Sequence, residues 1–269
     1  MSKKNHFLEQ YGPWALVTGA SSGIGEQFAR LLAELGFHLI IVARRENRLL
    51  NLASELHALY SVEVEPLCLD LSSLDFLEPL TAAMQGRDIG LLVSNAGFGL
   101  KGEHHQTDPA QMDRMLKLNS RAPMLLTHAI SPALIKRGQG GILLTGSIEG
   151  FLAFPWSASY AASKAFVLSL GESLWYELKP YGVDVLVLAP GSTDTEALPM
   201  QGFNPEEQFG LMSPQKVAKL ALAQLGKQPV FISGWMNRLF IRVLSALPRR
   251  IATSLAGSGM RSAIKKNQQ

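Results

Sequence analysis

Two side chains four residues apart, Tyr160 and Lys164, could together move a proton. They lie in a stretch with a helical pattern, where residues at positions i and i+4 share one face. A phenol with an unperturbed pKa of about 10 can donate a proton but is a poor base near neutrality. Lowering that pKa to about 7 takes roughly 4 kcal/mol, which one ammonium ~4 Å away supplies at an effective dielectric constant of about 20. The pair is therefore a candidate acid and base.

A glycine-rich turn lies far upstream of this pair. Thr18-Gly19-Ala20-Ser21-Ser22-Gly23-Ile24-Gly25 follows an apolar strand pattern and leads into a helical one. Glycines at such a turn let backbone amides approach a pyrophosphate, which the N-terminus of the helix then stabilises. The spacing is G-x-x-x-G-x-G rather than G-x-G-x-x-G, and an ordinary tight turn can have the same composition. The strand before the turn and the βαβ pattern around it favour nucleotide binding.

The residues after the second expected strand indicate which dinucleotide is bound. An acid at this place accepts from the ribose hydroxyls of NAD, whereas here the strand runs into Ala43-Arg44-Arg45-Glu46. A pair of arginines suits a 2′-phosphate through charge-assisted hydrogen bonds. Glu46 is the competing candidate but is expected inside the next helix, and Arg45 could be a solvated first-turn residue. The interpretation favours NADP(H) and predicts that Arg44→Ala weakens NADPH binding more than NADH binding.

Short apolar runs alternate with helical patterns along the first 190 residues. Helical spacing of apolar residues covers 25–35, 45–59 and 74–84, and Asp108-Pro109 reads as the start of a further helix. Near-continuous apolar strands joined by helices indicate a parallel sheet covered on both faces. We therefore expect an α/β, doubly wound, single-domain fold over residues 1–235, followed by an extension over 236–269. The expected strands are 15–17, 39–42, 62–67, 91–93, 142–144, 183–188 and a late one at 229–232.

Over about residues 13–195 the chain resembles the short-chain dehydrogenase/reductase family. The resemblance rests on TGASSGIG at 18–25, Asp70 in CLDLS, Asn95-Ala96-Gly97, Asn119, Ser147, Tyr160-Ala-Ala-Ser-Lys164, and Pro190-Gly191 with Thr195. Seven such elements in this order and spacing are highly specific. The family implies a Rossmann-type fold that binds NAD(P)(H) and transfers a hydride to a carbonyl or from an alcohol.

The resemblance also implies roles for single residues. Tyr160 would exchange the proton, Lys164 would hold the nicotinamide ribose, and Ser147 would donate a hydrogen bond to the reacting oxygen. Asn119 would hold a water that links Lys164 to solvent. Asp70 resembles the adenine contact, Asn95 a residue that stabilises the central sheet, and Thr195 a ligand of the nicotinamide amide. The full expected cofactor site comprises Gly19, Ser21, Ser22, Gly23, Ile24, Gly25, Arg44, Arg45, Asp70, Asn95, Ala96, Gly97, Tyr160, Lys164, Pro190, Gly191, Thr193 and Thr195.

Composition narrows the class of protein. The chain has 269 residues, 47% hydrophobic and 17% charged, which suits a substantial core and argues against a disordered chain. The lone cysteine, Cys68, excludes a disulfide framework and a multi-cysteine zinc site, and is expected to be a buried small hydrophobe. His104-His105 has no metal-ligand spacing and is expected in a surface loop. We see no apolar signal segment or spanning run and expect a cytoplasmic location.

The charge is unevenly distributed along the chain. All 22 acidic residues precede residue 208, whereas ten of the 25 basic residues follow it, so the formal charge is −7 before that point and +10 after it. In the extension, Met236, Leu239, Phe240, Val243, Leu244 and Leu247 share one helical face, with Arg238 and Arg242 off it. Such a helix can pack over the active site, pack on a neighbouring subunit, or make peripheral contact with an anionic membrane. No aromatic-interleaved basic platform indicates nucleic-acid binding.

The substrate leaves a weaker trace in the sequence. Apolar residues of 148–156 and of a long loop at 193–213 suggest a hydrophobic carbonyl or alcohol, although they could equally form a dimer contact or local core. The family resemblance implies a homodimer or homotetramer formed through the helices around 109–137 and 157–179. Two other functions stay open: a catalytically idle NADP(H)-binding regulator or scaffold, and an enzyme of the same superfamily that epimerises or dehydrates.

Overall fold

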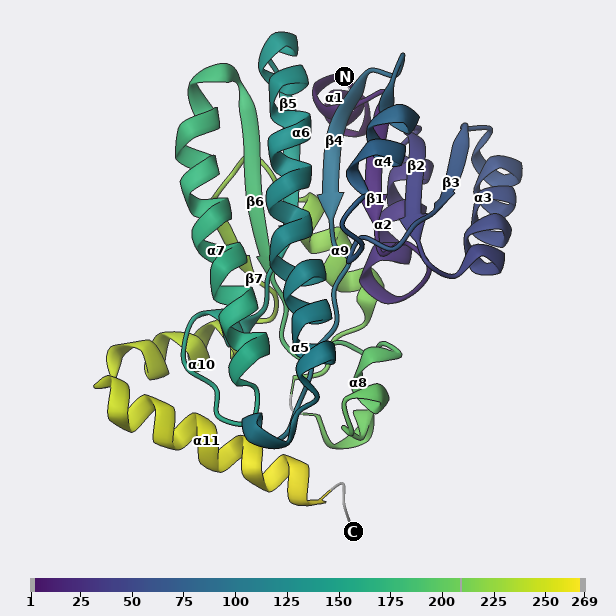
Figure 1. Ribbon diagram of the computed structural model, residues 1–269. Helices are drawn as coiled ribbons and strands as arrows, with labels where there is room; N and C mark the ends of the chain where they lie inside the picture. Colours follow the sequence, from purple (N-terminus) through teal and green to yellow (C-terminus); the bar gives the residue numbers. More distant parts are fainter. Residues whose placement is uncertain (1–2, 209, 267–269) are drawn as a thin grey trace.

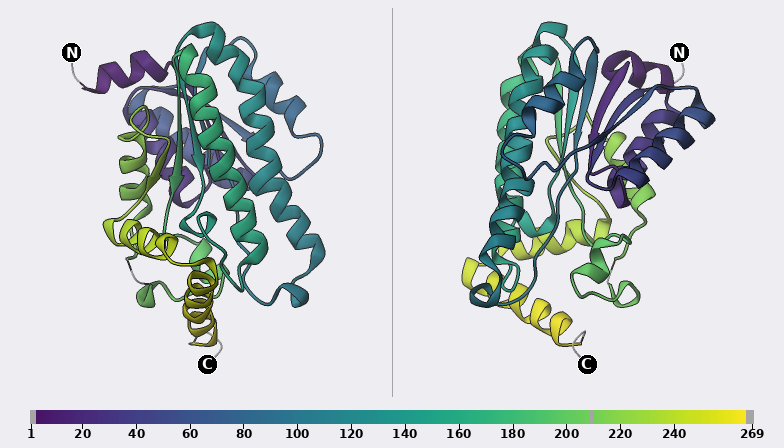
Figure 2. Two further views of the ribbon diagram at one scale, coloured as in Figure 1. Left: turned by 90° about the vertical axis from the view of Figure 1, so that its left-hand side faces the viewer. Right: turned by 45° about the vertical axis from the view of Figure 1, so that its right-hand side comes forward.

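The computed structural model describes residues 3–208 and 210–266, and within them seven parallel strands form one sheet with helices on both faces (Figures 1 and 2). The strand order is β3-β2-β1-β4-β5-β6-β7. This confirms the expected doubly wound, single-domain α/β fold. The strands are β1 (Trp14–Thr18), β2 (His38–Ala43), β3 (Val64–Cys68), β4 (Ile89–Ser94), β5 (Gly140–Thr145), β6 (Val183–Ala189) and β7 (Val230–Ile232).

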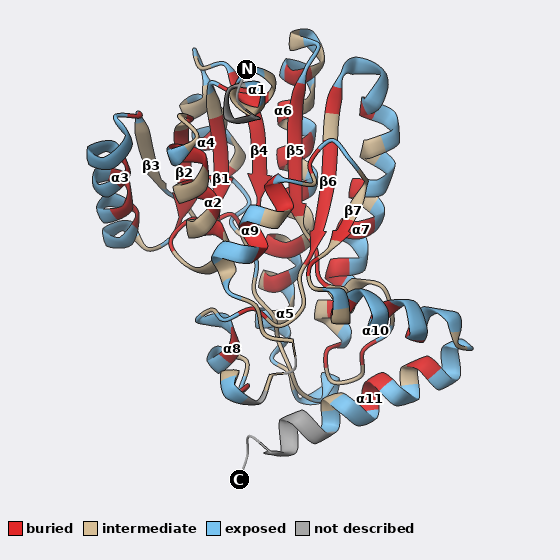
Figure 3. Ribbon diagram, turned by 180° about the vertical axis from the view of Figure 1, so that it is seen from behind, coloured by how far each residue is buried: buried red, intermediate tan, exposed pale blue. Residues whose placement is uncertain are grey.

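Each strand coincides with an apolar run in the sequence, and the central strands are almost wholly buried (Figure 3). The third strand begins at Val64, two residues later than expected. It also lies at an edge of the sheet and is only partly buried. The expectation for Cys68 is therefore wrong: at the end of this edge strand its thiol is exposed and donates to the carbonyl oxygen of Arg44 over 3.4 Å.

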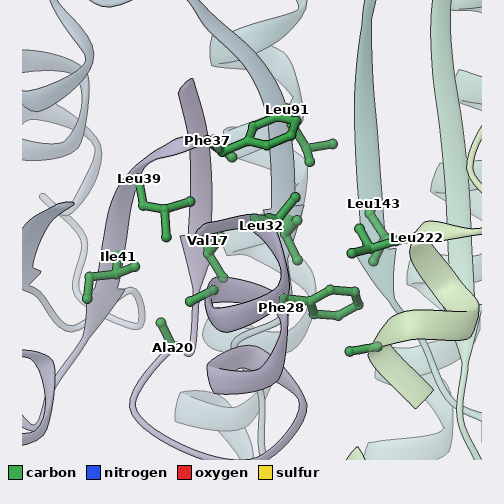
Figure 4. Close-up of a cluster of buried hydrophobic side chains, with 14 of the residues drawn as sticks. Val17, Ala20, Phe28, Leu32, Phe37, Leu39, Ile41, Leu91, Leu143 and Leu222 are labelled. Carbon is green, nitrogen blue, oxygen red and sulfur yellow. The ribbon is translucent and has the colours of Figure 1, made fainter. Parts of the chain in front are cut away.

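Two cores lie on the two faces of the sheet because neighbouring strand residues point to opposite sides. On one face α2 (Gly23–Glu34), α3 (Glu46–Tyr60) and α9 (Pro214–Leu222) contribute, and Figure 4 shows Phe28 and Leu32 of α2 packed there with Val17 and Leu39. On the other face lie α4 (Leu77–Met84), α6 (Ala122–Arg137) and α7 (Ala158–Leu178). A short α1 (Lys3–Tyr11), which we did not expect, precedes β1.

The helical stretch expected over 109–137 is interrupted. Asp108 accepts from the backbone N–H of Ala110 and starts α5 (Pro109–Leu116), as its sequence position predicts. A π-helical turn (Lys117–Arg121) then separates α5 from α6 and contains Asn119. Such turns cost regular hydrogen bonding and occur frequently at functional sites. Asn119 is thus placed by an irregularity that periodicity did not reveal.

The segments after β6 and β7 extend beyond the carboxyl edge of the sheet (Figures 1 and 2). The loop at 193–213 contains α8 (Ala197–Met200) and a 3-10 turn (Pro205–Glu207), and a bridge between Thr193 and Met212 closes its base. After β7 come α10 (Trp235–Ala246) and α11 (Arg249–Lys266). No helix of the described ranges is long and apolar enough to cross a bilayer.

The face of α10 that packs on the protein differs from the expected apolar face. Asn237, Ile241 and Leu244 are buried, whereas Leu239 and Val243 are 55% and 53% exposed. The buried set is rotated around the helix from the most apolar stripe because Asn237 anchors the first turn, donating to the carbonyl oxygen of Ser233 over 2.8 Å.

Candidate active site

The loops that follow β1, β4, β5 and β6 meet at one edge because all strands of the sheet run parallel. The carboxyl edge of such a sheet is where ligands bind in doubly wound folds. Every expected site residue lies in these loops, in the loops after β2 and β3, or in the helices that follow β1, β4 and β5.

The glycine-rich turn leaves no room for a side chain at Gly19 or Gly25. Gly19 has a φ of +69°, and a Cβ there would lie 2.9 Å from the Cα of Ala96. A Cβ at Gly25 would lie 2.2 Å from the carbonyl oxygen of Gly19. Ser22 is the N-cap residue of α2, but its side chain makes no hydrogen bond to the first backbone N–H groups of that helix. A pyrophosphate that must approach backbone amides fits this cradle.

Arg45 lies across the same turn. Its Nε is 3.1 Å from Ser21 Oγ, its Nη2 also donates to Ser22 Oγ, and its Nη1 is 2.7 Å from a Glu196 carboxylate oxygen. Arg44 is exposed and Glu46 is the first residue of α3. The guanidinium therefore lies against the glycine-rich turn, next to the hydroxyls of Ser21 and Ser22.

Asp70 and Asn95 are held by fixed partners. Asp70 accepts from the backbone N–H and hydroxyl of Ser72 and from Arg114 over 2.8 Å. Burial alone would raise the pKa of the Asp70 carboxyl, but these hydrogen bonds and the Arg114 charge hold it below its usual value. Asn95 donates to the carbonyl oxygen of Thr18 and accepts from Thr145, so its amide joins the ends of β1 and β5. The role that the family resemblance implied for Asn95, stabilising the sheet beside the cofactor, stays a prediction.

The side chain of Asn119 makes structural hydrogen bonds to Phe98 and Ser163. The amide Nδ2 donates to the carbonyl oxygen of Phe98 over 2.9 Å and to Ser163 Oγ over 3.1 Å, and Oδ1 accepts from the Phe98 N–H. These bonds join the π-helical turn to α7 and to the loop after β4. Binding of a water by Asn119 stays a prediction, which the backbone of this irregular turn would have to fulfil.

Ser147, Tyr160 and Lys164 come together beside Gly97. Lys164 Nζ donates to the carbonyl oxygen of Thr145 over 2.8 Å and lies 5.8 Å from the Tyr160 ring centroid. A Cβ at Gly97 would be 3.4 Å from that ammonium. Ser147 Oγ accepts from the backbone N–H of Glu149 over 3.2 Å, which leaves its own proton to donate. The arrangement offers one hydroxyl donor, one phenol and one ammonium at a common place.

The electrostatics of Tyr160 differ from the sequence-based argument, which expected Lys164 to lower the pKa of the phenol. Desolvation raises the pKa of Tyr160 above its usual value, and the negative charge of Glu149 raises it further, while a hydrogen bond with Ser147 opposes both. Burial lowers the pKa of Lys164 to about 8. Desolvation and the Glu149 carboxylate thus outweigh the effect of the single cation on the phenol.

The loop after β6 completes the site. The carbonyl oxygen of Pro190 accepts from the Ile148 N–H over 3.1 Å. A Cβ at Gly191 would lie 2.3 Å from Asn237 Nδ2, so only glycine fits beneath α10. The Thr195 methyl would lie 3.0 Å from a Cβ on Gly23. Thr195 thus lies against the glycine-rich turn, whereas Pro190 and Gly191 contact the segment after β5 and α10.

The substrate side is covered partly by the C-terminal extension. Phe154 is buried in a small cluster with Ala161 and Ala256, so α11 packs on the segment that follows Ser147. In the long loop, Leu198 and Phe203 are buried, whereas Met200 is 78% exposed. Phe209, also expected in this wall, lies outside the described residues. The described side chains include no cluster of three His, Cys, Asp or Glu that could hold a metal ion.

Sequence reasoning missed three residues near Tyr160: Lys101, Glu149 and Ser157. Their side chains form a buried network, with an ion pair of 2.6 Å between Lys101 and Glu149. The signal was two charged residues in otherwise apolar or glycine-rich runs, GFGLKG and SIEGFLAF.

Comparison with known proteins agrees with this geometry. A family model described as short chain dehydrogenase matches residues 13–203. The chain is 33% identical over 245 residues to a 7beta-hydroxysteroid dehydrogenase of Clostridium sardiniense, covering 91% of this chain and 94% of that one. It is 35% identical over 191 residues to a very-long-chain 3-oxoacyl-CoA reductase of Aspergillus clavatus, covering 66% of this chain but 54% of the reductase. A solved short-chain dehydrogenase from Sphingobium yanoikuyae, in complex with NADPH, superposes with a TM-score of 0.78 at 31% identity, over 88% of this chain and 96% of that one.

Proposed function

Because the chain belongs to the short-chain dehydrogenase family, we propose that it is an NADP(H)-dependent oxidoreductase that interconverts a hydrophobic carbonyl compound and its alcohol. The observation that carries the proposal is the convergence of Ser147, Tyr160 and Lys164 beside Gly97, at the carboxyl edge of the sheet. A catalytically idle regulator has no need for a hydroxyl donor, a phenol and a buried ammonium together.

The cofactor preference is supported by Arg45. A guanidinium that already contacts Ser21 and Ser22 provides charge-assisted donors for a 2′-phosphate, and no acid occupies the corresponding position at the end of β2. The glycine-rich turn would hold the pyrophosphate, and Lys164 would hold the ribose hydroxyls. The related Sphingobium enzyme was crystallised with NADPH. When bound, this cofactor supplies or accepts the hydride.

The side chains of the protein then handle the proton. Ser147 donates its hydroxyl proton to the carbonyl oxygen of the substrate, while its Oγ accepts from the backbone N–H of Glu149. Tyr160 delivers its proton to that oxygen as negative charge develops. The raised pKa of the phenol keeps it protonated near neutrality, the form that reduction requires. Lys164 stabilises the phenolate that remains, and solvent replaces its proton.

For the substrate we propose a bulky lipid-like carbonyl, either a ketosteroid or a 3-oxoacyl thioester. Two kinds of relative act on such molecules by their names, a 7beta-hydroxysteroid dehydrogenase and a very-long-chain 3-oxoacyl-CoA reductase. The apolar segment at 151–156 follows Ser147 in the chain and packs against α11, so its side chains are candidates to enclose an apolar body. The steroid is the first choice, since that match extends over almost the whole of both chains.

The decisive experiment follows NADPH absorbance with purified protein and a panel of a 7-oxosteroid, a long-chain 3-oxoacyl-CoA and small aldehydes. We expect turnover of at least one bulky carbonyl, with NADPH preferred to NADH. Binding of NADPH without turnover of any compound would instead support the catalytically idle regulator.

Assembly is part of the same proposal. We expect a homodimer or homotetramer, because α10 leaves Leu239, Phe240 and Val243 exposed and the two parts of the chain carry opposite formal charge. Sedimentation velocity gives the mass, and cosedimentation with anionic vesicles tests the competing contact of α10 with a membrane surface.

A further inference from the structure

A buried ion pair lies against the ring of Tyr160. Lys101 Nζ is 2.6 Å from each carboxylate oxygen of Glu149 and 2.8 Å from Ser157 Oγ. Only 4% of the Lys101 side chain and 17% of the Glu149 side chain are exposed. The ammonium also lies 4.8 Å from the centroid of the Tyr160 ring. A charged pair in this place needs an explanation, because a buried pair is seldom more stable than apolar residues of the same volume.

The pair joins three segments that carry residues of the active site. Lys101 follows Gly97 in the loop after β4, Glu149 follows Ser147 after β5, and Ser157 starts α7 just before Tyr160. Glu149 contacts Ser147 directly, because the backbone N–H of Glu149 donates to Ser147 Oγ. Ser157 in turn donates to the Glu149 carboxylate. The network therefore sets the position of the serine hydroxyl relative to the phenol.

The charges around Tyr160 come from three elements. Lys164 lies on the same helix, Lys101 comes from the loop after β4, and Glu149 from the turn after β5. The other described groups nearby are the neutral hydroxyls of Ser147 and Ser157. Beyond them, His104 contacts Ser159, and Arg261 of α11 lines a groove with Trp156. Glu149 is thus the one anion that faces the phenol among the described residues.

We propose that Lys101 and Glu149 are positioning residues for proton transfer, fixing Ser147 relative to Tyr160 and acting on the phenol with opposite charges. This inference rests on the proposed function. Glu149 disfavours the phenolate and Lys101 favours it, so the pair balances the two forms of Tyr160 without touching the substrate. The desolvation and the carboxylate effect on the pKa of Tyr160 agree with this arrangement.

The test compares the wild type with Glu149→Gln, Lys101→Met and the double variant. The readout is the pH profile of kcat/KM for oxidation, by NADP+, of the 7β-hydroxysteroid or 3-hydroxyacyl-CoA whose carbonyl form the wild type reduces. Oxidation needs the phenolate, so the profile rises with pH. We expect Glu149→Gln to move the midpoint down by about 1 pH unit, and Lys101→Met to move it up by a similar amount. The double variant should lie below Lys101→Met.

The effect of Glu149→Gln is measured twice, once with Lys101 present and once in the Lys101→Met background. If a variant in one background does not fold, the other background still gives the test. Removing Glu149 must lower the midpoint of the pH profile in each background whose variants fold, and one such background is enough for the test. Circular dichroism and NADPH binding establish which variants are folded. Glu65→Gln, which breaks the remote ion pair with Arg87, is the matched control and should leave the midpoint in place. Equal rate losses with unmoved midpoints would reduce the pair to a purely structural role and overturn the proposal.

A readout without turnover separates this inference from the proposed function. Ultraviolet difference titration of tyrosinate, with Tyr160→Phe as the reference, reports the ionisation of Tyr160 alone. If the wild type reduces no carbonyl, the proposed function fails, yet Glu149→Gln must still lower the pH at which Tyr160 ionises. If the wild type is active but Glu149→Gln changes neither measurement, only the inference fails.

Discussion

At the scale of single residues, the site depends on which groups are deprived of water. Lys164 is buried and donates to the Thr145 carbonyl, and burial lowers the pKa of its ammonium to about 8. The same desolvation raises the pKa of the Tyr160 phenol, and the negative charge of Glu149 raises it further. Near neutrality the phenol is therefore neutral, and the neighbouring ammonium has a pKa close to the pH of the solution. Such a pair suits proton transfer near neutrality.

Tyr160→Phe removes the hydroxyl that we propose protonates the substrate oxygen. We expect carbonyl reduction to fall by at least ~10²-fold, while the Kd for NADPH changes little because the ring stays in place. Steady-state kinetics and fluorescence titration with NADPH measure the two quantities. A variant that keeps most of its turnover would show that another group donates the proton.

Arg45→Ala should weaken NADPH binding much more than NADH binding, because we propose that the guanidinium contacts the 2′-phosphate, which NADH lacks. A charge-assisted contact of this kind contributes about 1.5–3 kcal/mol, so we expect a rise in the Kd for NADPH of roughly tenfold or more. Calorimetric titration with both cofactors makes the comparison. Arg44→Ala, the change suggested by the sequence alone, is the companion variant. Similar losses for NADPH and NADH in both variants would contradict the 2′-phosphate assignment.

Lys164 also links stability to pH. Its pKa of about 8 in the folded protein lies below the ordinary value of 10.5, so between these values the unfolded chain binds more protons and stability rises with pH. Below pH 8 both states are protonated, and the cost of burying the ammonium is fully present. Lys164→Met should therefore stabilise the protein at pH 7, and the gain should shrink as the pH rises above 8. Urea unfolding at several pH values tests this, and a constant gain would argue against a buried charge.

At the scale of elements, loops from several strands define the site, and the C-terminal helices hold two of them. Asn237 of α10 packs under Gly191, and α11 packs on the segment after Ser147. The ion pairs of Glu196 with Arg45 and Arg48 join the long loop to the start of α3. Substrate selectivity in this protein is thus expected to depend on helices that contain none of the reacting groups.

A glycine pair on α11 isolates this contribution. A Cβ at Gly257 would lie 3.0 Å from Pro155 Cγ, whereas a Cβ at Gly259, two residues on, meets nothing within 4 Å. Gly257→Val should push α11 off the substrate segment, costing about 1–3 kcal/mol and raising the KM for the bulky carbonyl while the Kd for NADPH is kept. Gly259→Val is the matched control, with the same change in helix propensity. Equal effects of both variants would mean that the packing of α11 is irrelevant to substrate binding.

At the scale of the whole molecule, the parallel sheet brings distant segments to one edge and the charge is divided between two parts of the chain. The formal charge is −7 before residue 208 and +10 after it, and α10 exposes several apolar residues. Both features agree with the proposed contact with a second copy.

Cofactor binding should stabilise the entire domain, because the glycine-rich turn, α3 and the long loop converge on it. At about 100 times Kd, binding to the folded state alone adds about 2.7 kcal/mol, and we expect NADPH to raise the Tm by roughly 5 °C or more. NADH at the same concentration should raise it less. Thermal unfolding followed by fluorescence gives both shifts, and Arg45→Ala should remove most of the difference between them.

The sequence by itself determined the sheet, its strands and the set Ser147, Tyr160 and Lys164. Strand runs of buried apolar residues and a helical spacing of four are local properties, and the motifs are contiguous or nearly so. Tertiary structure alone decided what surrounds the phenol, since Lys101 and Glu149 come from loops after different strands and meet only when the sheet is formed. It also decided that Arg45 rather than Arg44 lies on the glycine-rich turn, that Cys68 is exposed at an edge strand, and which face of α10 is buried. Burial and long-range charge depend on contacts between distant segments, and a pattern along one strand or helix does not contain them.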